Sequence, residues 1–243
     1  YLLLNYDDPT ARDMAQQAPS RVFFFSLAKE LSSGAFIRGD DLVVSLNGGK
    51  DKVVCAVSEV RLLGRHNLTN VLAASLAAAL CGVEPRVAGQ VARSFQGLPH
   101  RLELVRQADG VSYYNDSIAT TPDRAVAAIS AFHRPIVLIA GGREKHLPLE
   151  PLAQAIRQGC KAVVLYGEGG GLLQEALAQT ERPENTGLTV YRAHAFDEAV
   201  EKASSLAKSG DVVLLAPGFT SFDQFASYEE RGKRFRELVE VAR

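Results

Sequence analysis

Residues 135–146 carry the sequence Pro-Ile-Val-Leu-Ile-Ala-Gly-Gly-Arg-Glu-Lys-His, and this stretch decides the fold. It begins with a short apolar run that ends at a glycine pair, which is typical of a strand buried on both faces. Three further strand-like runs follow at residues 162–166, 188–192 and 211–216, with helical patterns between them. Each gap has room for a crossover helix, so we predict a doubly wound α/β domain with a mostly parallel, Rossmann-like sheet.

A hairpin and a break precede this parallel pattern. Residues 102–115 form two strand-like runs that are joined through an Asp-Gly turn signal. Immediately before them, Gly97-Leu98-Pro99 combines the two strongest breakers of regular structure. We therefore predict a domain boundary here, with one domain over residues 1–98 and a second over residues 99–243.

The first domain shows a different pattern, which predicts an α+β fold. Strand-like runs at residues 22–27, 42–46 and 52–60 predict a small antiparallel sheet. Two helices follow, the second of them over residues 85–95. The first helix has one apolar face, formed by four leucines that recur every fourth residue: Leu68, Leu72, Leu76 and Leu80.

Composition excludes several functional classes. The 243 residues include 27 Lys and Arg against 28 Asp and Glu, so the chain lacks the basic surplus with which proteins neutralise nucleic-acid phosphates. The longest weakly polar stretch, residues 71–83, is too short to span a bilayer. We expect a cytoplasmic protein without nucleic-acid or membrane partners. Because the chain opens at Tyr1 in a strand-like run and its only methionine is Met14, we also expect a fragment.

Ligands of open parallel sheets bind outside the carboxyl ends of the strands, where helix N-termini present free N–H groups. In residues 115–121, the last residue, Thr121, suits a helix N-cap, but capping does not explain the polar residues before it. Those residues are Asn115, Asp116, Ser117 and Thr120, and their place on a loop favours function. In residues 141–146, Lys145 sets an ammonium beside a strand end, which suits a carboxylate or a phosphate.

Two other segments follow predicted strands of the same sheet. Residues 167–171, Gly-Glu-Gly-Gly-Gly, lack the glycine spacing of a dinucleotide site, and we predict a flexible turn. In residues 217–222, Thr220 or Ser221 can cap the last helix while the amides of that helix face the ligand. We predict that the large apolar side chains of this region belong to the core: Phe222, Phe225, Phe235 and Val239.

Other chemistries lack their motifs. No Gly-x-x-x-x-Gly-Lys-Ser/Thr phosphate loop and no Gly-x-Ser-x-Gly nucleophile elbow occur in the sequence. The five histidines show no paired spacing that would bind a metal. The residues by themselves therefore predict neither a catalytic nucleophile nor a metal site in this chain.

Six segments, taken in order, closely resemble the Mur ligases. They are Leu-Asn-Tyr-Asp-Asp-Pro at residues 4–9, Leu-Gly-Arg-His-Asn-Leu-Thr-Asn at 63–70, Gly-Leu-Pro-His-Arg-Leu-Glu at 97–103, Asn-Asp-Ser-Ile-Ala-Thr-Thr-Pro at 115–122, Gly-Gly-Arg-Glu-Lys-His at 141–146 and Ser-Phe-Asp-Gln-Phe at 221–225. The Asn-Asp-Ser-x-Ala-Thr loop resembles the members that add D-glutamate, whereas other members carry a His-containing loop there.

The resemblance implies a fold and an activity. Residues 1–98 would be the C-terminal part of a P-loop-type ATP-binding domain, and residues 99–243 the amino-acid-binding domain. The implied reaction is the ATP-dependent ligation of D-glutamate to UDP-N-acetylmuramoyl-L-alanine through an acyl phosphate, in peptidoglycan synthesis. The UDP-binding domain, the phosphate loop and the Mg²⁺ ligands would lie upstream, so this chain alone is predicted to make no product.

The resemblance also assigns residues. It implies that three residues contact ATP: Asn70, Arg101 and Asp116. It implies that five contact D-glutamate: Thr120, Lys145, Ser221, Phe222 and Tyr228, with Tyr228 further along the helix that follows Ser221. It assigns no catalytic residue and no metal ligand within this chain. Ile118 stands where many members carry Lys, so the contacts of that lysine are not implied here.

Two alternatives were weighed against this interpretation. A non-catalytic amino-acid-binding or regulatory module could retain the ligase fold without its activity, and this alternative stays open. A glutamate-adding ligase that acts on folate would carry an Asp-Gly-Ala-His type loop at residues 115–120. The sequence there is Asn-Asp-Ser-Ile-Ala-Thr, which disfavours the folate enzyme.

Overall fold

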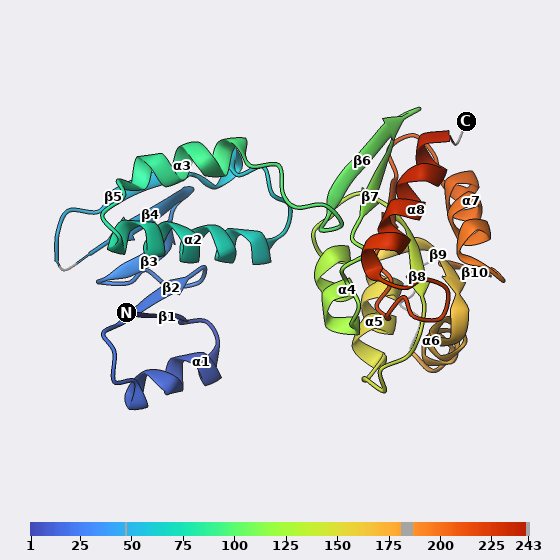
Figure 1. Cartoon of the computed structure of the whole chain (residues 1–243), viewed down its shortest axis with the longest axis horizontal. Coiled ribbons are helices and arrows are strands. Elements are labelled where there is room, and N and C mark those ends of the chain that lie inside the picture. Colours follow the sequence, from blue (N-terminus) through green and yellow to red (C-terminus); the bar gives the residue numbers. More distant parts are fainter. Residues whose placement is uncertain (47, 181–186, 242–243) are drawn as a thin grey trace. The chain divides into compact units, whose positions relative to one another are not determined.

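A computed structural model describes residues 1–46, 48–180 and 187–241. The chain divides into two compact units, Tyr1–Gln96 and Gly97–Arg243. Each unit has a sheet of its own, and helices pack against each sheet (Figure 1). None of the described helices is both long enough and apolar enough to cross a membrane.

The N-terminal unit is built on a five-stranded mixed sheet in the order β1-β2-β3-β4-β5. Its strands are β1 (Leu2–Asn5), β2 (Val22–Ser26), β3 (Gly34–Arg38), β4 (Asp41–Ser45) and β5 (Lys52–Ala56). β2 runs parallel to β1 and to β3, and only β3, β4 and β5 pair antiparallel. The prediction of a wholly antiparallel sheet is therefore wrong. β3 escaped prediction because it opens with glycine, a weak strand former that is needed here: a side chain at Gly34 would meet the carbonyl oxygen of Phe24 at 2.1 Å.

Helices complete the N-terminal unit. They are α1 (Pro9–Met14), η1 (Ala15–Gln17), η2 (Val57–Glu59), α2 (Arg65–Leu80) and α3 (Pro85–Ser94). Leu72 and Leu76 of α2 are fully buried in the core over the sheet, which confirms the predicted apolar face. The strand predicted over residues 52–60 ends earlier, at Ala56, because the chain turns there into η2.

The C-terminal unit contains a six-stranded sheet in the order β10-β9-β8-β11-β7-β6. Its strands are β6 (Glu103–Ala108), β7 (Val111–Asn115), β8 (Ile136–Gly141), β9 (Cys160–Tyr166), β10 (Thr189–Arg192) and β11 (Val212–Leu215). β7 to β11 run parallel, and β6 is an antiparallel edge strand. The predicted hairpin is confirmed: its turn residues Asp109 and Gly110 both have positive φ, as tight hairpin turns require.

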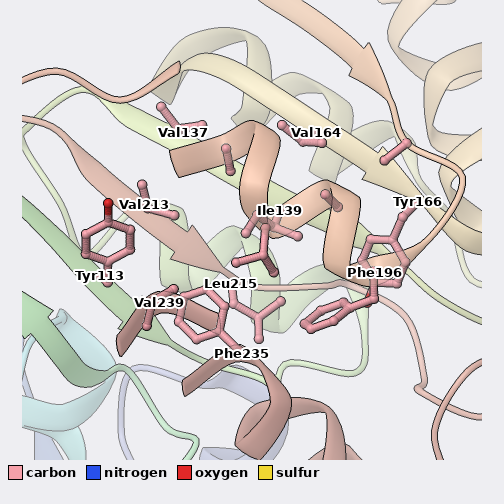
Figure 2. Close-up of a cluster of buried hydrophobic side chains, with 14 of the residues drawn as sticks. Tyr113, Val137, Ile139, Val164, Tyr166, Phe196, Val213, Leu215, Phe235 and Val239 are labelled. Carbon is pink, nitrogen blue, oxygen red and sulfur yellow. The ribbon is translucent and has the colours of Figure 1, made fainter. Parts of the chain in front are cut away.

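Helices cover both faces of this sheet, which confirms the doubly wound α/β prediction. They are α4 (Pro122–Ile129), α5 (Glu150–Gly159), α6 (Gly167–Gln179), α7 (Phe196–Leu206) and α8 (Tyr228–Val241). α4, α5 and α6 pack in succession on one face, and α7 packs beside α8 on the other (Figure 1). Figure 2 shows the buried cluster under α7 and α8, where Phe235 lies near Leu215. Burial of these side chains supplies the main driving force for the fold.

The glycine-rich segment 167–171 is the first turn of α6, so the prediction of a flexible turn is wrong. Packing explains one of its glycines clearly. A side chain at Gly169 would meet the ring of Phe219 at 2.3 Å, whereas one at Gly170 would meet the end of the flexible Arg192 side chain at 1.9 Å, and Gly171 has nothing within 4 Å. Close approach of Phe219 therefore selects glycine at position 169, against its weak helix propensity.

Candidate functional site

Two strand-end segments of the C-terminal unit are joined by backbone hydrogen bonds. The N–H of Arg143, just after β8, donates to the carbonyl of Thr220 at 2.9 Å, and the N–H of Thr220 donates back at 3.1 Å. The hydroxyl of Thr220 donates to the same Arg143 carbonyl at 3.0 Å. Lys145 lies two residues after Arg143, and Ser221 directly follows Thr220, so the structure brings the two predicted contacts to the same edge of the sheet.

Lys145 and Ser221 differ in their surroundings. Lys145 is exposed, and no described residue pairs with its ammonium. Ser221 is only 2% exposed, and its carbonyl accepts the N–H groups of Gln224 and Phe225 in a short turn. At this edge, the unpaired ammonium of Lys145 therefore extends from a backbone that is held by hydrogen bonds. This arrangement suits a carboxylate ligand.

The polar loop after β7 has two kinds of residue. Asn115 is fully buried, and its amide donates to the Glu103 carboxylate at 3.3 Å and to the Gly232 carbonyl at 3.2 Å. The Ser117 hydroxyl donates to the Tyr228 carbonyl at 2.8 Å. Asn115 and Ser117 therefore hold the loop against neighbouring elements, and this structural role accounts for their presence there.

Asp116 and Thr120 have fewer partners in the same loop. The carboxylate of Asp116 accepts the N–H of Leu102 at 3.0 Å, and the side chain of Thr120 is half-buried. Burial raises the pKa of Asp116 to about 6, although Arg101 and Arg124 nearby act in the opposite direction. The two predicted nucleotide contacts Arg101 and Asp116 thus lie close enough to interact.

Asn70, the third predicted nucleotide contact, belongs to the N-terminal unit. It lies on α2, where its amide donates to the side-chain oxygen of Asn67 at 3.2 Å. It also lines a groove of about 430 Å³ between α2 and α3, whose other walls are almost wholly apolar. Asn70 therefore belongs to the N-terminal unit, whereas Arg101 and Asp116 belong to the C-terminal unit.

The last helix begins later than predicted, which corrects two expectations. α8 starts at Tyr228, and the Ser227 hydroxyl accepts the N–H of Glu230 at 3.2 Å, so Ser227 is the cap and neither Thr220 nor Ser221 is. Tyr228 is accordingly the first residue of that helix. The intervening turn between Ser221 and Ser227 is stabilised by its own hydrogen bonds, which local sequence does not distinguish from a helix start.

Phe222 is 61% exposed, so its predicted place in the core is wrong. It sits on the turn after Ser221 and is not part of the buried cluster that includes Phe235 and Val239, against which Phe225 packs. Thr121 does precede α4 as its N-cap residue, but its side chain makes no capping hydrogen bond. Because Phe222 is exposed, its ring is available to a ligand.

A cavity that no sequence signal indicated lies beside these segments. It has a volume of about 720 Å³, and its lining residues come from the ends of β8, β9, β10 and β11: Arg143, Gly167, Glu168, Arg192, Ala193, His194, Phe222, Asp223 and Gln224. Arg192 and His194 were not predicted. Applying the strand-end rule to β10 as well would have found them.

Metal-ligating side chains do not cluster among the described residues. Nowhere among them do three or more His, Cys, Asp or Glu side chains come together in a group that could hold a metal ion. A hard cation such as Mg²⁺ is usually held by carboxylates together with substrate phosphates. We therefore assign no chemical step in this chain to a metal.

Two family models match the chain, one in each unit. The Mur ligase middle domain matches residues 1–78, and the Mur ligase, glutamate ligase domain matches residues 100–219. Among solved structures, a pseudomurein peptide ligase type C from Methanothermus fervidus aligns with 98% of this chain and 56% of its own, at a TM-score of 0.67 and 15% identity. A UDP-N-acetylmuramate-alanine ligase from Thermotoga maritima aligns with 90% and 48%, at 0.62 and 17%. At these identities the structures support the fold.

Curated relatives are more similar in sequence. A protein of Pelotomaculum thermopropionicum is 44% identical over 98% of this chain and 51% of its own length. One of Clostridium novyi is 40% identical, with the same coverage. Both are named UDP-N-acetylmuramoylalanine--D-glutamate ligase, and the chain spans about half the length of each. With its fold, both domain models and these relatives in agreement, the chain belongs to the Mur ligase family.

Proposed function

We propose that this chain is part of an ATP-dependent ligase that joins D-glutamate to UDP-N-acetylmuramoyl-L-alanine in peptidoglycan synthesis. The observation that carries the proposal is the pairing of Arg143 with Thr220, which brings Lys145 and Ser221 to one edge of the sheet. The names of the Pelotomaculum and Clostridium relatives support the same substrate pair. In this proposal, residues 99–243 bind the amino acid and residues 1–98 contribute to ATP binding.

D-Glutamate carries two carboxylates and an ammonium, and the proposed contacts match these groups. The exposed Lys145 ammonium would bind one carboxylate, and the hydroxyls of Thr120 and Ser221 would donate to carboxylate oxygens. Phe222 and Tyr228 would cover the methylene groups of the ligand. The amine would remain free of these side chains, as a nucleophile must.

Three residues are proposed to contact the nucleotide. Arg101 would bind the ribose or the phosphates through its guanidinium, and Asp116 would lie beside the nucleotide. Asn70 would form hydrogen bonds with the adenine. The phosphate loop and the Mg²⁺ ligands are proposed to lie outside these residues.

The proposed chemistry needs activation because oxide is a poor leaving group. The γ-phosphate of ATP would transfer to the sugar-linked carboxylate, giving ADP and an acyl phosphate. The amine of D-glutamate would then attack the acyl carbon, so that a C–N bond forms, the C–O bond to phosphate breaks, and the amine loses a proton. The contribution of this chain would be to position the amine and to exclude water from the acyl phosphate.

A chimera tests the proposal. This chain would replace the corresponding half of the Pelotomaculum relative, and ADP release would be measured with D-glutamate and the nucleotide sugar present or omitted. We expect ADP release that requires both substrates, and none from the chain alone. Free acceptance of L-glutamate or a diamino acid would exclude this member of the family. D-Glutamate binding by a soluble, folded but inactive chimera would instead favour the non-catalytic binding module.

A further inference from the structure

Arg231 is the largest fully buried side chain of the described residues, and it has an unusual set of partners. Two other arginines of α8 reach carboxylates: Arg234 binds Asp197 and Arg236 binds Glu103. Arg231 is 0% exposed, and its hydrogen-bond partners among the described residues are a serine hydroxyl, a tyrosine hydroxyl and backbone carbonyls. All of these hydrogen-bond partners are neutral, and the Asp223 carboxylate after Ser221 interacts with the guanidinium electrostatically. Burying a guanidinium among neutral groups is costly.

The guanidinium joins three strand ends. Its Nε donates to the Ser117 hydroxyl and its Nη2 to the Ser117 carbonyl, both at 2.9 Å, in the loop after β7. Both Nη groups donate to the carbonyl of Phe219 after β11, at 3.2 Å. Nη1 also donates to the hydroxyl of Tyr166 at the end of β9, at 3.3 Å. One side chain therefore fixes the separation of loops that lie far apart in sequence.

Every segment proposed to bind D-glutamate borders this guanidinium. Thr120 lies three residues after Ser117, Ser221 two residues after Phe219, and Tyr228 three residues before Arg231 on α8. The Tyr228 carbonyl accepts the Ser117 hydroxyl, which ties the start of α8 into the same network.

The loop of Lys145 approaches the guanidinium as well. A side chain at Gly142 would lie 3.2 Å from Nη1 of Arg231 and only 2.1 Å from the carbonyl of Thr220. Gly142 has a φ of +130°, so this close approach depends on glycine. The backbone that carries Lys145 is therefore packed directly over the guanidinium.

We propose that Arg231 is a positioning residue that sets the geometry of the D-glutamate site without touching the ligand. The inference rests on the proposed function. Its planar fork holds the loops after β7 and β11 and the start of α8 in the arrangement in which Thr120, Ser221 and Tyr228 face one ligand. A lysine cannot reproduce this, because a single ammonium cannot span Ser117, Phe219 and Tyr166 together.

The experiment compares two buried arginines at opposite ends of the sheet. Arg157 is 6% exposed and donates to the carbonyl of Leu177, far along the chain from the site. D-Glutamate binding by the chain is measured by calorimetry for the parent, R231M, R231K and R157M, at a temperature where circular dichroism shows each to be folded. We expect binding at least about tenfold weaker in R231M, about threefold weaker in R231K, and unchanged in R157M.

The outcomes separate the two proposals. Equal affinity in parent and R231M, or equal losses in R231M and R157M, would overturn the positioning role. Failure of the parent chain to bind D-glutamate would instead count against the proposed function. If R231M does not fold, R231K and S117A decide, because each removes part of the network: unchanged affinity in both would overturn the inference.

Discussion

The two ends of the strands in the six-stranded sheet differ in whether their accessible polar groups have partners. At the amino edge, the buried Asp211 carboxylate binds the Lys161 ammonium and the N–H of Lys208, and Arg134 donates to the carbonyl of Gly210. At the carboxyl edge, Lys145 has no partner among the described residues and Phe222 is exposed. Groups that satisfy one another hold a fold together, whereas unsatisfied groups at a strand end are available to a ligand. The contrast separates structural residues from binding residues within one sheet.

The largest effect is expected from glycines at the two edges. G142A at the carboxyl edge would place a methyl group 2.1 Å from the Thr220 carbonyl, with a φ of +130°, and should lower the free energy of unfolding by about 4 kcal/mol. G210A at the amino edge has a φ of +97° but nothing within 4 Å, so about 1 kcal/mol is expected. Urea denaturation of the chain measures both. Equal losses of unfolding free energy in G142A and G210A would show that the positive φ, and not the contact with the Thr220 carbonyl, determines the effect.

At the amino edge, D211N should leave the Lys161 ammonium without its carboxylate. We expect a loss of about 3 kcal/mol in the free energy of unfolding, at the low end for a broken buried pair because Lys161 is partly exposed. D-Glutamate affinity of the folded variant should be unchanged. A tenfold loss of affinity in D211N would remove the proposed distinction between the two edges.

Asp116 predicts a pH dependence at the carboxyl edge. Burial raises its pKa from 3.8 to about 6, so between these values the folded state keeps a proton that the unfolded state releases. Stability therefore falls as pH rises through this window. Above it, D116N should be more stable than the parent by about 2 to 3 kcal/mol, and below pH 4 the difference should vanish. A pH-independent difference in urea denaturation between pH 3.5 and 7.5 would contradict this.

Substitution of Lys145 should weaken D-glutamate binding and leave stability nearly unchanged, which is the reverse of the effects expected for Asp211. K145M removes an exposed, unpaired ammonium, so the free energy of unfolding should change by less than about 0.5 kcal/mol. D-Glutamate should bind about twentyfold more weakly, since one charge-assisted hydrogen bond is lost. Calorimetry with the parent and with K161M as a lysine control at the amino edge checks this. Loss of stability without loss of affinity would place Lys145 among the structural residues.

Much of the C-terminal unit could be predicted because its signals are local. Apolar runs of strand length and the Asp-Gly turn specify β7 to β11 and the hairpin, and the strand-end rule then locates residues 141–146 and 217–222. Predictions failed where distant contacts decide the structure. Gly169 of α6 reflects the close approach of Phe219, and Phe222 is exposed although large aromatic side chains usually belong to the core.

Arg231 gave no signal at all in the sequence. It is one of several arginines in a polar helix, and its neighbours Arg234 and Arg236 are partly exposed. Its burial depends on Ser117, which lies 114 positions away. Pairings over such separations cannot be read from periodicity or from local propensity.

The antiparallel strand β6 has a consequence for association between chains. A parallel sheet that ended on a long, bare strand would present a row of unpaired N–H and C=O groups to other molecules. β6 is the edge strand on that side, but a register shift interrupts its pairing with β7 between Leu104 and Arg106, and its Arg106 donates to the carbonyl of Glu240 near the end of α8. The edge strand on the opposite side of the sheet, β10, is four residues long and ends in a charged Arg192. The edge strands β6 and β10 are thus poor templates for intermolecular β-sheet. This should favour a monodisperse chain over aggregates at high concentration.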